Sequence, residues 1–198
     1  MKIYFARHGQ TDWNIQRKVQ GTTDIPLNEN GIRQAQELCK NLEYRKISFE
    51  KIYTSYQTRA VKTAQIVSDY FHTGYEIVQG LEEMNLGLFE GHNWDEIMDM
   101  YSEEHKLWTS NKRYNQSPNG ESYQMVMERL FKALDHIFEQ HDIDSDKNLL
   151  IISHGAVIMT LLAMKRDIPF EQSHTIEVDN ATPIEFSIEE LEEIRKKI

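Results

Sequence analysis

Cysteine is nearly absent from this chain, and positive charge is scarce. Cys39 is the single cysteine among 198 residues, so no disulfide can form within the chain, and a reducing compartment is expected. Because Cys39 lies within a helical pattern, we expect a buried structural thiol. The formal net charge of -10 argues against a general nucleic-acid-binding protein, whose surface would be basic. An anionic substrate would have to be attracted by a local cluster of arginines and histidines.

Long apolar segments are missing as well. No apolar run reaches the length of a membrane-spanning helix, and the chain opens on a strand-like pattern instead of a signal peptide. We therefore expect a cytoplasmic protein that has no membrane partner. The sequence carries no indication of the oligomeric state. The length predicts a single domain, residues 1–198, which can build a hydrophobic core without metal or disulfide.

One stretch near the N-terminus, KIYFARHGQTDWN, organises the rest of the chain. Residues 3–6 are apolar β-formers and predict a buried strand. The strand ends at Arg7, His8 and Gly9, beyond the carboxyl end of the strand, where open α/β sheets bind ligands. Asn14 can add a neutral hydrogen bond. These groups suit a dianionic phosphate beside a nucleophilic imidazole, although the tripeptide alone would be interpreted as a surface turn.

A second strand ends in the same way. Residues 148–153, NLLIIS, form another apolar run, which His154 and Gly155 follow before a helical pattern begins. Strand ends of this kind can meet in one crevice of an α/β sheet, so His8 and His154 can lie together although they are distant in sequence. The pairing favours a binding site over two unrelated turns.

Four motifs, in this order, resemble those of the histidine phosphatase superfamily, which has the phosphoglycerate mutase-like fold. They are RHGQTDWN, TSYQTRAVKTA, EEMNLGLFEG and SHG, and the resemblance extends from residue 2 to about residue 182. It implies an α/β fold, a three-layer sandwich in which a mostly parallel central sheet is flanked by helices. A helical insertion, residues 86–120, is expected over the carboxyl edge of the sheet, where it would roof the active site.

The resemblance also assigns substrate-binding positions. Asn14 and Gly21 match phosphate contacts of the family, and Gln20 lies beside Gly21 in a loop, residues 15–28, that is expected to fold over the phosphate. Gly155 is expected at the same site because it follows His154. For Gln20 the alternative is a position in an ordinary connecting loop.

Arg59 falls in the first turn of a predicted helix, which Ser55 or Thr58 could cap. The helix dipole opposes a cation at this position, so helix stability does not explain the arginine. A guanidinium that binds phosphate oxygens in a bidentate manner does explain it. The spacing of Ser55 and Arg59 also matches the second motif of the family. The alternative is a solvated surface arginine.

The leaving oxygen of a phosphate ester needs a proton, so a carboxylic acid must lie beside it. Glu82 and Glu83 are both available, and the residues themselves do not decide between them. The proton donor of the family lies four residues before the first glycine of the third motif. That offset from Gly87 selects Glu83.

The resemblance implies a two-step transfer through a phosphohistidine. His8 would attack phosphorus as a neutral imidazole, and Glu83 would protonate the leaving oxygen. Arg7, Arg59 and His154, with His154 as a cation, would hold the phosphate oxygens. No cofactor or metal is expected, since arginine and histidine supply the positive charge. Two histidines and a carboxylate can also form an iron site, but the neighbouring arginines would repel a metal cation.

The class of reaction leaves alternatives open. The short insertion leaves room for water, which favours a phosphatase acting on a small phosphorylated metabolite over a cofactor-dependent phosphoglycerate mutase. Lys112 and Arg113 could bind a second anionic group of the substrate, or they could belong to a solvated charged loop. A non-catalytic binding module would be expected to have lost one of the site residues, and none is missing.

Hydrophobic periodicity predicts the remaining elements. Helices are expected at residues 28–42 with Asn28 as N-cap, 94–108, 121–141 with Ser122 as a cap, 156–164 and, as a short surface helix, 189–198. Further strands are expected at residues 49–53, 75–78, 175–178 and 184–188. The other histidines are expected at the surface or at helix caps.

Overall fold

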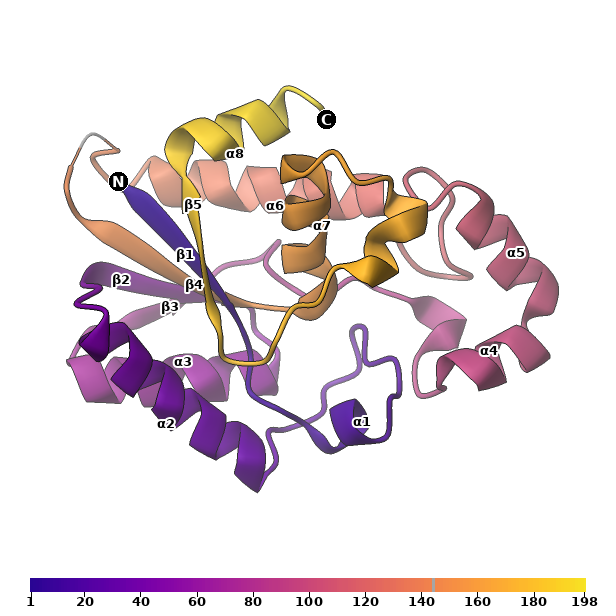
Figure 1. Ribbon diagram of the computed structural model, residues 1–198, viewed down its shortest axis with the longest axis horizontal. Helices are drawn as coiled ribbons and strands as arrows, with labels where there is room; N and C mark the ends of the chain where they lie inside the picture. Colours follow the sequence, from indigo (N-terminus) through magenta and orange to yellow (C-terminus); the bar gives the residue numbers. More distant parts are fainter. Residues whose placement is uncertain (144) are drawn as a thin grey trace.

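A five-stranded sheet forms the centre of the computed structural model, which describes residues 1–143 and 145–198 (Figure 1). Its strand order is β3-β2-β4-β1-β5, and all neighbours are parallel except β5, which runs antiparallel to β1. The strands are β1 (Lys2–Arg7), β2 (Phe49–Thr54), β3 (Tyr75–Ile77), β4 (Asn148–Ser153) and β5 (Pro183–Ser187). The mostly parallel sheet confirms the predicted fold class.

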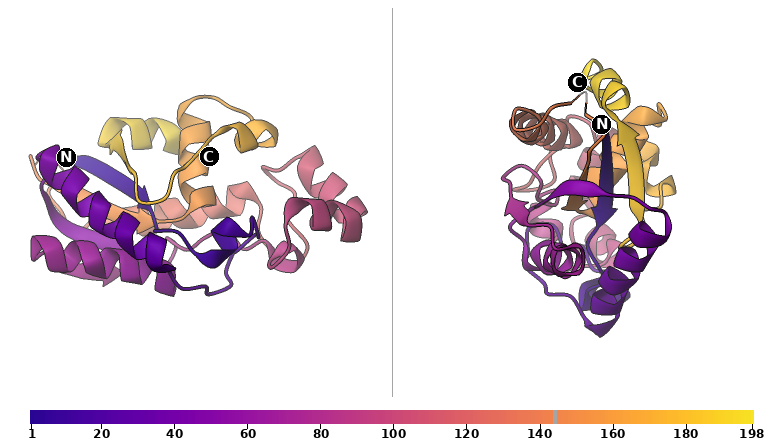
Figure 2. Two further views of the ribbon diagram at one scale, coloured as in Figure 1. Left: turned by 60° about the horizontal axis from the view of Figure 1, so that its bottom comes forward. Right: turned by 90° about the vertical axis from the view of Figure 1, so that its left-hand side faces the viewer.

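Helices cover both faces of the sheet, and Figure 2 shows the sheet between the two helical layers. One face carries α2 (Glu29–Tyr44) and α3 (Thr58–Phe71), and the opposite face carries α6 (Tyr123–Phe138), α7 (Gly155–Lys165) and α8 (Ile188–Arg195). In the described part of the chain, no helix combines the length and the apolar character needed to cross a membrane.

The alternation of side chains along β1 divides the interior into two cores. Tyr4 and Ala6 pack in the core beneath α2 and α3, whereas Ile3 and Phe5 belong to the larger core beneath α6 and α7. Successive side chains of a strand point to opposite faces, so a strand covered on both sides needs a continuous apolar run. Cys39 is buried in the smaller core as predicted, and its burial raises the pKa of the thiol to about 11.

Short helices lie beyond the sheet, near the carboxyl ends of β1 and β4 (Figure 1). They are α1 (Asp12–Ile15), η1 (Gly87–Phe89), α4 (Trp94–Met100), α5 (Ser102–Ser110) and η2 (Phe170–Thr175). The single helix predicted for residues 94–108 is therefore divided in two. The backbone of Tyr101 leaves the helical conformation between them, and its ring packs near Phe89 and His92.

The predicted N-caps of two flanking helices are confirmed. The Asn28 side chain accepts a hydrogen bond from the backbone N–H of Gly31, and the Ser122 side chain accepts one from Met125. These bonds satisfy backbone donors that the first turn of a helix leaves unpaired.

One expectation near the C-terminus is wrong, and another is correct only in part, because the tail forms a helix as expected but not one confined to the surface. Residues 175–178 form the end of η2 and an irregular segment, because the edge of the sheet beside β1 is taken by β5. Ile176 and Val178 are nevertheless buried, which gives this segment the apolar alternation of a strand. The tail is an amphipathic helix that contributes to the core, since Leu191 and Ile194 are buried.

One histidine expected at the surface or at a cap joins two elements instead. The Nε2 atom of His141 lies 2.7 Å from the hydroxyl of Tyr53 in β2, and its Nδ1 atom contacts the Glu50 carboxylate. These contacts fasten the loop after α6 to β2.

Two glycines hold the loop after β1 against α2. A Cβ atom on Gly31 would lie 2.1 Å from the carbonyl oxygen of Gln10, and one on Gly9 would lie 2.3 Å from that of Gly31. Backbone atoms cannot move aside as a flexible side chain can. The close approach therefore requires glycine at both positions and fixes the segment that follows His8.

Replacing Gly31 with alanine should destabilise the protein. Alanine favours a helix by about 1 kcal/mol over glycine, but overpacking against fixed backbone costs about 1–3 kcal/mol. We expect a net loss in the free energy of unfolding, measured by urea denaturation. Gly74→Ala is the control, because a Cβ atom there meets nothing within 4 Å. Equal stability of the two variants would contradict the packing argument.

Candidate active site

The carboxyl ends of two neighbouring strands bring His8 and His154 together. β1 and β4 pair in parallel with Arg7 opposite Ser153, so the residues that follow each strand are neighbours. The centroids of the two imidazole rings are 5.2 Å apart, and both side chains are buried. The convergence expected from the sequence is confirmed.

Hydrogen bonds define the tautomer of His8. Its Nδ1 atom lies 2.7 Å from the carbonyl oxygen of Gly9, which can only accept, so Nδ1 carries the proton. Its Nε2 atom accepts a hydrogen bond from the Nε–H of Arg59 at 3.2 Å. Burial, together with the positive charges of Arg7 and Arg59, holds the pKa of His8 well below the usual 6.5. His8 is therefore a neutral imidazole whose lone pair lies on Nε2.

Arg59 is completely buried, which excludes the solvated alternative. Its Nη1 atom donates to the carbonyl oxygen of Thr23 and its Nη2 atom to that of Gly21, each at 2.8 Å. Burial lowers the pKa of Arg59, and the carboxylates of Glu83, Asp24 and Glu90 oppose this effect. The arginine thus joins the start of α3 to the loop that carries Gly21.

Neither residue proposed from the sequence caps α3. The Asp24 carboxylate accepts hydrogen bonds from the backbone N–H of Thr58 at 2.8 Å and from its hydroxyl at 2.9 Å, so the cap comes from another segment. Ser55 instead lies 2.7 Å from Nε2 of His154. Its hydroxyl orients the second histidine.

The surroundings of His154 favour a neutral ring. Burial lowers its pKa well below the usual 6.5, and the positive charges of Arg59, Arg129 and Arg7 lower it further. Its Nδ1 atom is buried and has no hydrogen-bond partner in the described part of the chain. The cation expected from the sequence is therefore not the form that the protein itself favours, and a charged His154 requires an anion beside it.

Arg7 lies beside Gly155. A Cβ atom on Gly155 would be 3.4 Å from the guanidinium carbon of Arg7, which is an ordinary van der Waals distance, so space alone does not require the glycine. Nη1 of Arg7 donates to the carbonyl oxygen of Val178 at 2.8 Å, while its Nε–H is buried without a partner in the described residues. Burial lowers the pKa of Arg7, and the negative charges of Glu83 and Asp179 counteract it.

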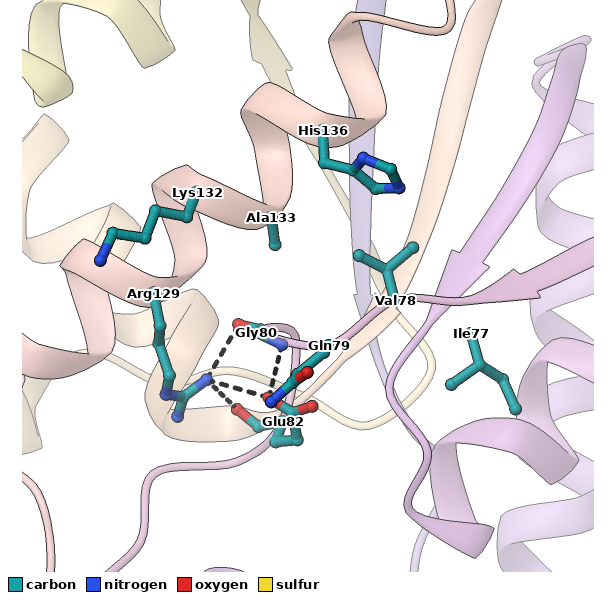
Figure 3. A pocket seen from close by; sticks show the side chains of 9 residues that line it. All are labelled: Ile77, Val78, Gln79, Gly80, Glu82, Arg129, Lys132, Ala133 and His136. Atoms are coloured by element: carbon teal, nitrogen blue, oxygen red, sulfur yellow. Dashed lines mark hydrogen bonds and ion pairs between the residues drawn. The ribbon is translucent and has the colours of Figure 1, made fainter.

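The two adjacent glutamates point in different directions. The Glu83 carboxylate accepts hydrogen bonds from the backbone N–H of Met84 at 2.9 Å and from that of Ala156, in the first turn of α7, at 3.1 and 3.2 Å. The Glu82 carboxylate accepts from the N–H of Gly80 at 2.7 Å and pairs with Arg129 in a separate cavity (Figure 3). This arrangement agrees with the choice of Glu83 from the motif offset.

A cavity of about 460 Å³ lies at this end of the sheet. Six residues singled out in the sequence line it: Arg7, Asn14, Gln20, Gly21, Glu83 and Gly155. His8, Arg59 and His154 do not line the cavity but are buried behind its walls, where Arg59 contacts both Gly21 and His8. Because the side-chain amide oxygen of Asn14 accepts from the backbone N–H of Thr11, the side-chain NH2 group is what Asn14 can offer to a ligand.

Gln57, which was not predicted as a site residue, connects the two sides of the cavity. Its amide nitrogen donates to the carbonyl oxygen of Gly21 at 2.9 Å, and its amide oxygen accepts from the backbone N–H of Glu83 at 2.9 Å. Gln57 is fully buried. Its position inside the second motif is the signal that could have drawn attention to it.

Glu90 was also missed, although it lies in the third motif. Its carboxylate accepts hydrogen bonds from the backbone N–H groups of Thr22, Thr23 and Leu86 at 2.8–3.1 Å. A Cβ atom on Gly21, where φ is +49°, would lie 2.0 Å from this carboxylate. Glu90 thus fixes the loop whose carbonyl groups hold Arg59.

The side chains of Lys112 and Arg113 have different surroundings. Arg113 donates to the Gln124 side chain at 3.1 Å and to the carbonyl oxygen of Lys197 at 2.6 Å, so it ties the insertion to the C-terminal tail. Lys112 is buried, with its ammonium nitrogen 4.7 Å from the centroid of the Trp108 ring. The interpretation as a solvated loop is therefore wrong for Lys112.

Within the described residues, no group of three or more histidine, cysteine, aspartate or glutamate side chains is arranged to hold a metal ion. The charged groups around the cavity are instead the arginines, histidines and Glu83 described above.

Comparison with known proteins agrees with the resemblance that the motifs indicate. The model of the histidine phosphatase superfamily (branch 1) matches residues 3–194. The uncharacterised phosphatase PhoE of Bacillus subtilis (strain 168) is 36% identical over 161 residues, which cover 81% of this chain and 75% of that protein.

Two further similarities concern enzymes with named substrates. The 6-phosphofructo-2-kinase/fructose-2,6-bisphosphatase of Caenorhabditis elegans is 30% identical over 176 residues, or 89% of this chain, which spans only 36% of that enzyme. The crystal structure of the alpha-ribazole phosphatase from Shigella flexneri superposes with a TM-score of 0.78 at 28% identity and covers 93% of this chain and 89% of that chain.

The two buried histidines should make stability depend on pH. Their pKa values are lowered on folding, so between those values and about 6.5 the unfolded chain binds more protons than the folded one. The free energy of unfolding should therefore reach its full value above about pH 6.5. It should decrease as the pH falls below this value, by at most about 1.4 kcal/mol per pH unit for each histidine.

Urea denaturation across this range checks the prediction. His8→Asn should reduce the slope below about pH 6.5, whereas His72→Asn, at an exposed left-handed position that asparagine tolerates, should leave it unchanged. A slope identical in His8→Asn and wild type would contradict the assignment of His8 as a neutral buried ring.

Proposed function

The chain belongs to branch 1 of the histidine phosphatase superfamily, and from this membership we propose that it hydrolyses the phosphate monoester of a small metabolite through a phosphohistidine on His8. The observation that carries the proposal is the neutral His8 ring, whose Nε2 lone pair is buried between Arg59 and His154. The relatives described above are named as phosphatases, which supports hydrolysis as the reaction.

Binding of the substrate phosphate exchanges one hydrogen bond for another. Arg59 Nε–H now donates to the His8 nitrogen that would attack. A phosphate oxygen is a stronger acceptor than imidazole because it is charged, so it takes this N–H and frees the lone pair. Further donors come from the Nε–H of Arg7, which has no partner among the described residues, and from the amide group of Asn14. The dianion also provides the negative charge that a protonated His154 requires.

The chemistry then proceeds in two steps. In the first, Glu83 enters as the protonated carboxylic acid; His8 Nε2 forms a bond to phosphorus while the bond to the ester oxygen breaks, and Glu83 gives its proton to the departing alkoxide. Arg7, Arg59 and His154 stabilise the charge on the other phosphate oxygens. In the second step Glu83 takes a proton from water, whose oxygen attacks phosphorus and releases inorganic phosphate and free His8.

Residues 86–120 act as a roof over this site within a single domain. Trp94 from α4 and Trp108 from α5 line the same cavity as Glu83, which supports this role. Both helices also connect to the main core, since Ile97 and Trp108 are part of its buried cluster. The insertion can therefore select substrates without forming a separate folding unit.

A phosphoglycerate mutase is the less favoured alternative. Enzymes of that kind bind the glycerate carboxylate with paired basic residues, for which Lys112 and Arg113 are the candidates. The Arg113 guanidinium is already engaged by Gln124 and by the carbonyl group of Lys197. The pair is thus divided, which weakens the case for isomerisation.

Release of phosphate from 4-nitrophenyl phosphate in the presence of EDTA tests the proposal. Activity should survive EDTA and fall at least about a thousandfold in His8→Asn, because the nucleophile is lost. His72→Asn serves as the control and should keep its activity. Loss of activity with EDTA would indicate a metal mechanism, and full activity of His8→Asn would assign the chemistry to another residue. Isomerisation of 3-phosphoglycerate without phosphate release would favour the mutase.

A further inference from the structure

A second and larger cavity adjoins the one that holds Glu83. Its volume is about 750 Å³, and four residues line both this cavity and the 460 Å³ cavity: Trp94, Trp108, Tyr123 and Met159. The remaining walls come from α5, from Lys112 and from η2. Figure 1 shows α4 and α5, which carry several of these residues, beyond the sheet. A group attached to a phosphate in the first cavity can extend directly into the second.

Parallel aromatic rings form one side of this cavity. Trp94 and Trp108 stack with their planes 5° apart, Trp108 and Tyr123 with theirs 19° apart, and Tyr123 continues the series onto Phe170 at 8°. Trp94 stands at the outer end, and 42% of its surface is exposed. Aromatic side chains bind other flat rings by offset stacking. The wall therefore favours a planar ligand group over a small aliphatic one.

Two hydrogen-bond donors on this wall have no acceptor among the described residues. Lys112 is only 9% exposed, and in the described part of the chain its ammonium group makes neither an ion pair nor a hydrogen bond. Glu171 accepts from the backbone N–H of Lys112 and not from its ammonium group. Burial lowers the pKa of Lys112, and the negative charge of Glu171 opposes this shift. The indole N–H of Trp108 is buried without a partner in the described residues. Buried polar groups are normally paired, so this N–H points to an acceptor on a ligand, and the ammonium group over the same ring adds a positive charge.

Tyr123 indicates the path between the two cavities. Burial raises the pKa of its hydroxyl to about 12, and the nearby Glu83 carboxylate contributes to this shift. Tyr123 also lines both cavities. An ester oxygen beside Glu83 thus places the rest of the alcohol along Tyr123, in the direction of Trp108 and Lys112.

Resting on the proposed function, we propose that this second cavity binds the alcohol part of the substrate, and that the substrate is a phosphate monoester of an alcohol bearing a planar aromatic group with a carboxylate. The planar group stacks on the exposed ring of Trp94, and the carboxylate pairs with Lys112. A cavity of this volume is the size expected for a ligand much larger than serine or glycerate. Small aliphatic esters would leave it unfilled.

Three alkyl phosphates test the proposal: ethyl phosphate, 2-(2-naphthyl)ethyl phosphate and its 6-carboxy derivative. All three release a primary alkoxide, so differences in kcat/KM report binding of the alcohol part more than leaving-group reactivity. We expect kcat/KM to rise about tenfold from the ethyl to the naphthylethyl ester and about tenfold again with the carboxylate, mainly through KM.

Variants assign these gains to residues. Lys112→Met should remove the preference for the carboxylated over the uncharged naphthyl ester, and Lys112→Arg should keep most of it. Trp94→Ala should reduce the preference for the naphthylethyl over the ethyl ester. Lys106→Met, on the exposed face of α5 where Lys106 pairs with Glu103, is the matched control and should keep both preferences.

The outcomes separate this inference from the function on which it rests. Hydrolysis of all three esters at similar kcat/KM, with 4-nitrophenyl phosphate also cleaved, would overturn the inference and leave the proposed function intact. A carboxylate preference that persists in Lys112→Met would overturn the assignment of Lys112. Failure to hydrolyse any phosphate ester would overturn the proposed function itself.

Discussion

A buried guanidinium is the interaction on which the rest of the site depends. Arg59 donates to two carbonyl groups of the loop 21–23 and to Nε2 of His8. A buried cation is costly unless its donors are satisfied, so the loop must close over the start of α3 for the protein to fold. Burial and the charge of Arg7 lower the pKa of His8, and the charge of Arg59 lowers it further. One side chain therefore shapes the loop and also helps to keep the proposed nucleophile neutral.

Carboxylates around this cation explain how an acidic protein holds a site for an anion. Glu83, Asp24 and Glu90 each act against the effect of burial on Arg59. Asp24 and Glu90 also accept backbone hydrogen bonds, so their charges serve the loop and are not directed at the cavity. Arg7 and Asn14, by contrast, line the cavity and have donors to offer. The overall charge of -10 therefore says little about the field that a bound phosphate would meet.

The sequence was informative wherever a local pattern decides the structure. The ends of two apolar strands predicted that His8 and His154 would meet, because parallel strands share one edge. Contacts between distant segments were not predictable: Gln57 bridges Gly21 and Glu83, and Asp24 caps α3, yet nothing local indicates either partner. The segment 175–178 misled because apolar alternation arises from burial whether or not a strand forms. Glu83 was separated from Glu82 by the motif offset alone, since periodicity does not fix side-chain directions in a loop.

The identity of the phosphorylated atom tests the central claim most directly. Because Nδ1 of His8 is bound to the carbonyl group of Gly9, only Nε2 is free to attack once a phosphate has taken the Arg59 N–H. Rapid quenching during turnover of a ³²P-labelled substrate, followed by alkaline hydrolysis and chromatography against both phosphohistidine isomers, identifies the atom. The account predicts the Nε2 isomer on the peptide that contains His8. Label on Nδ1, on another residue, or on no residue at all would contradict it.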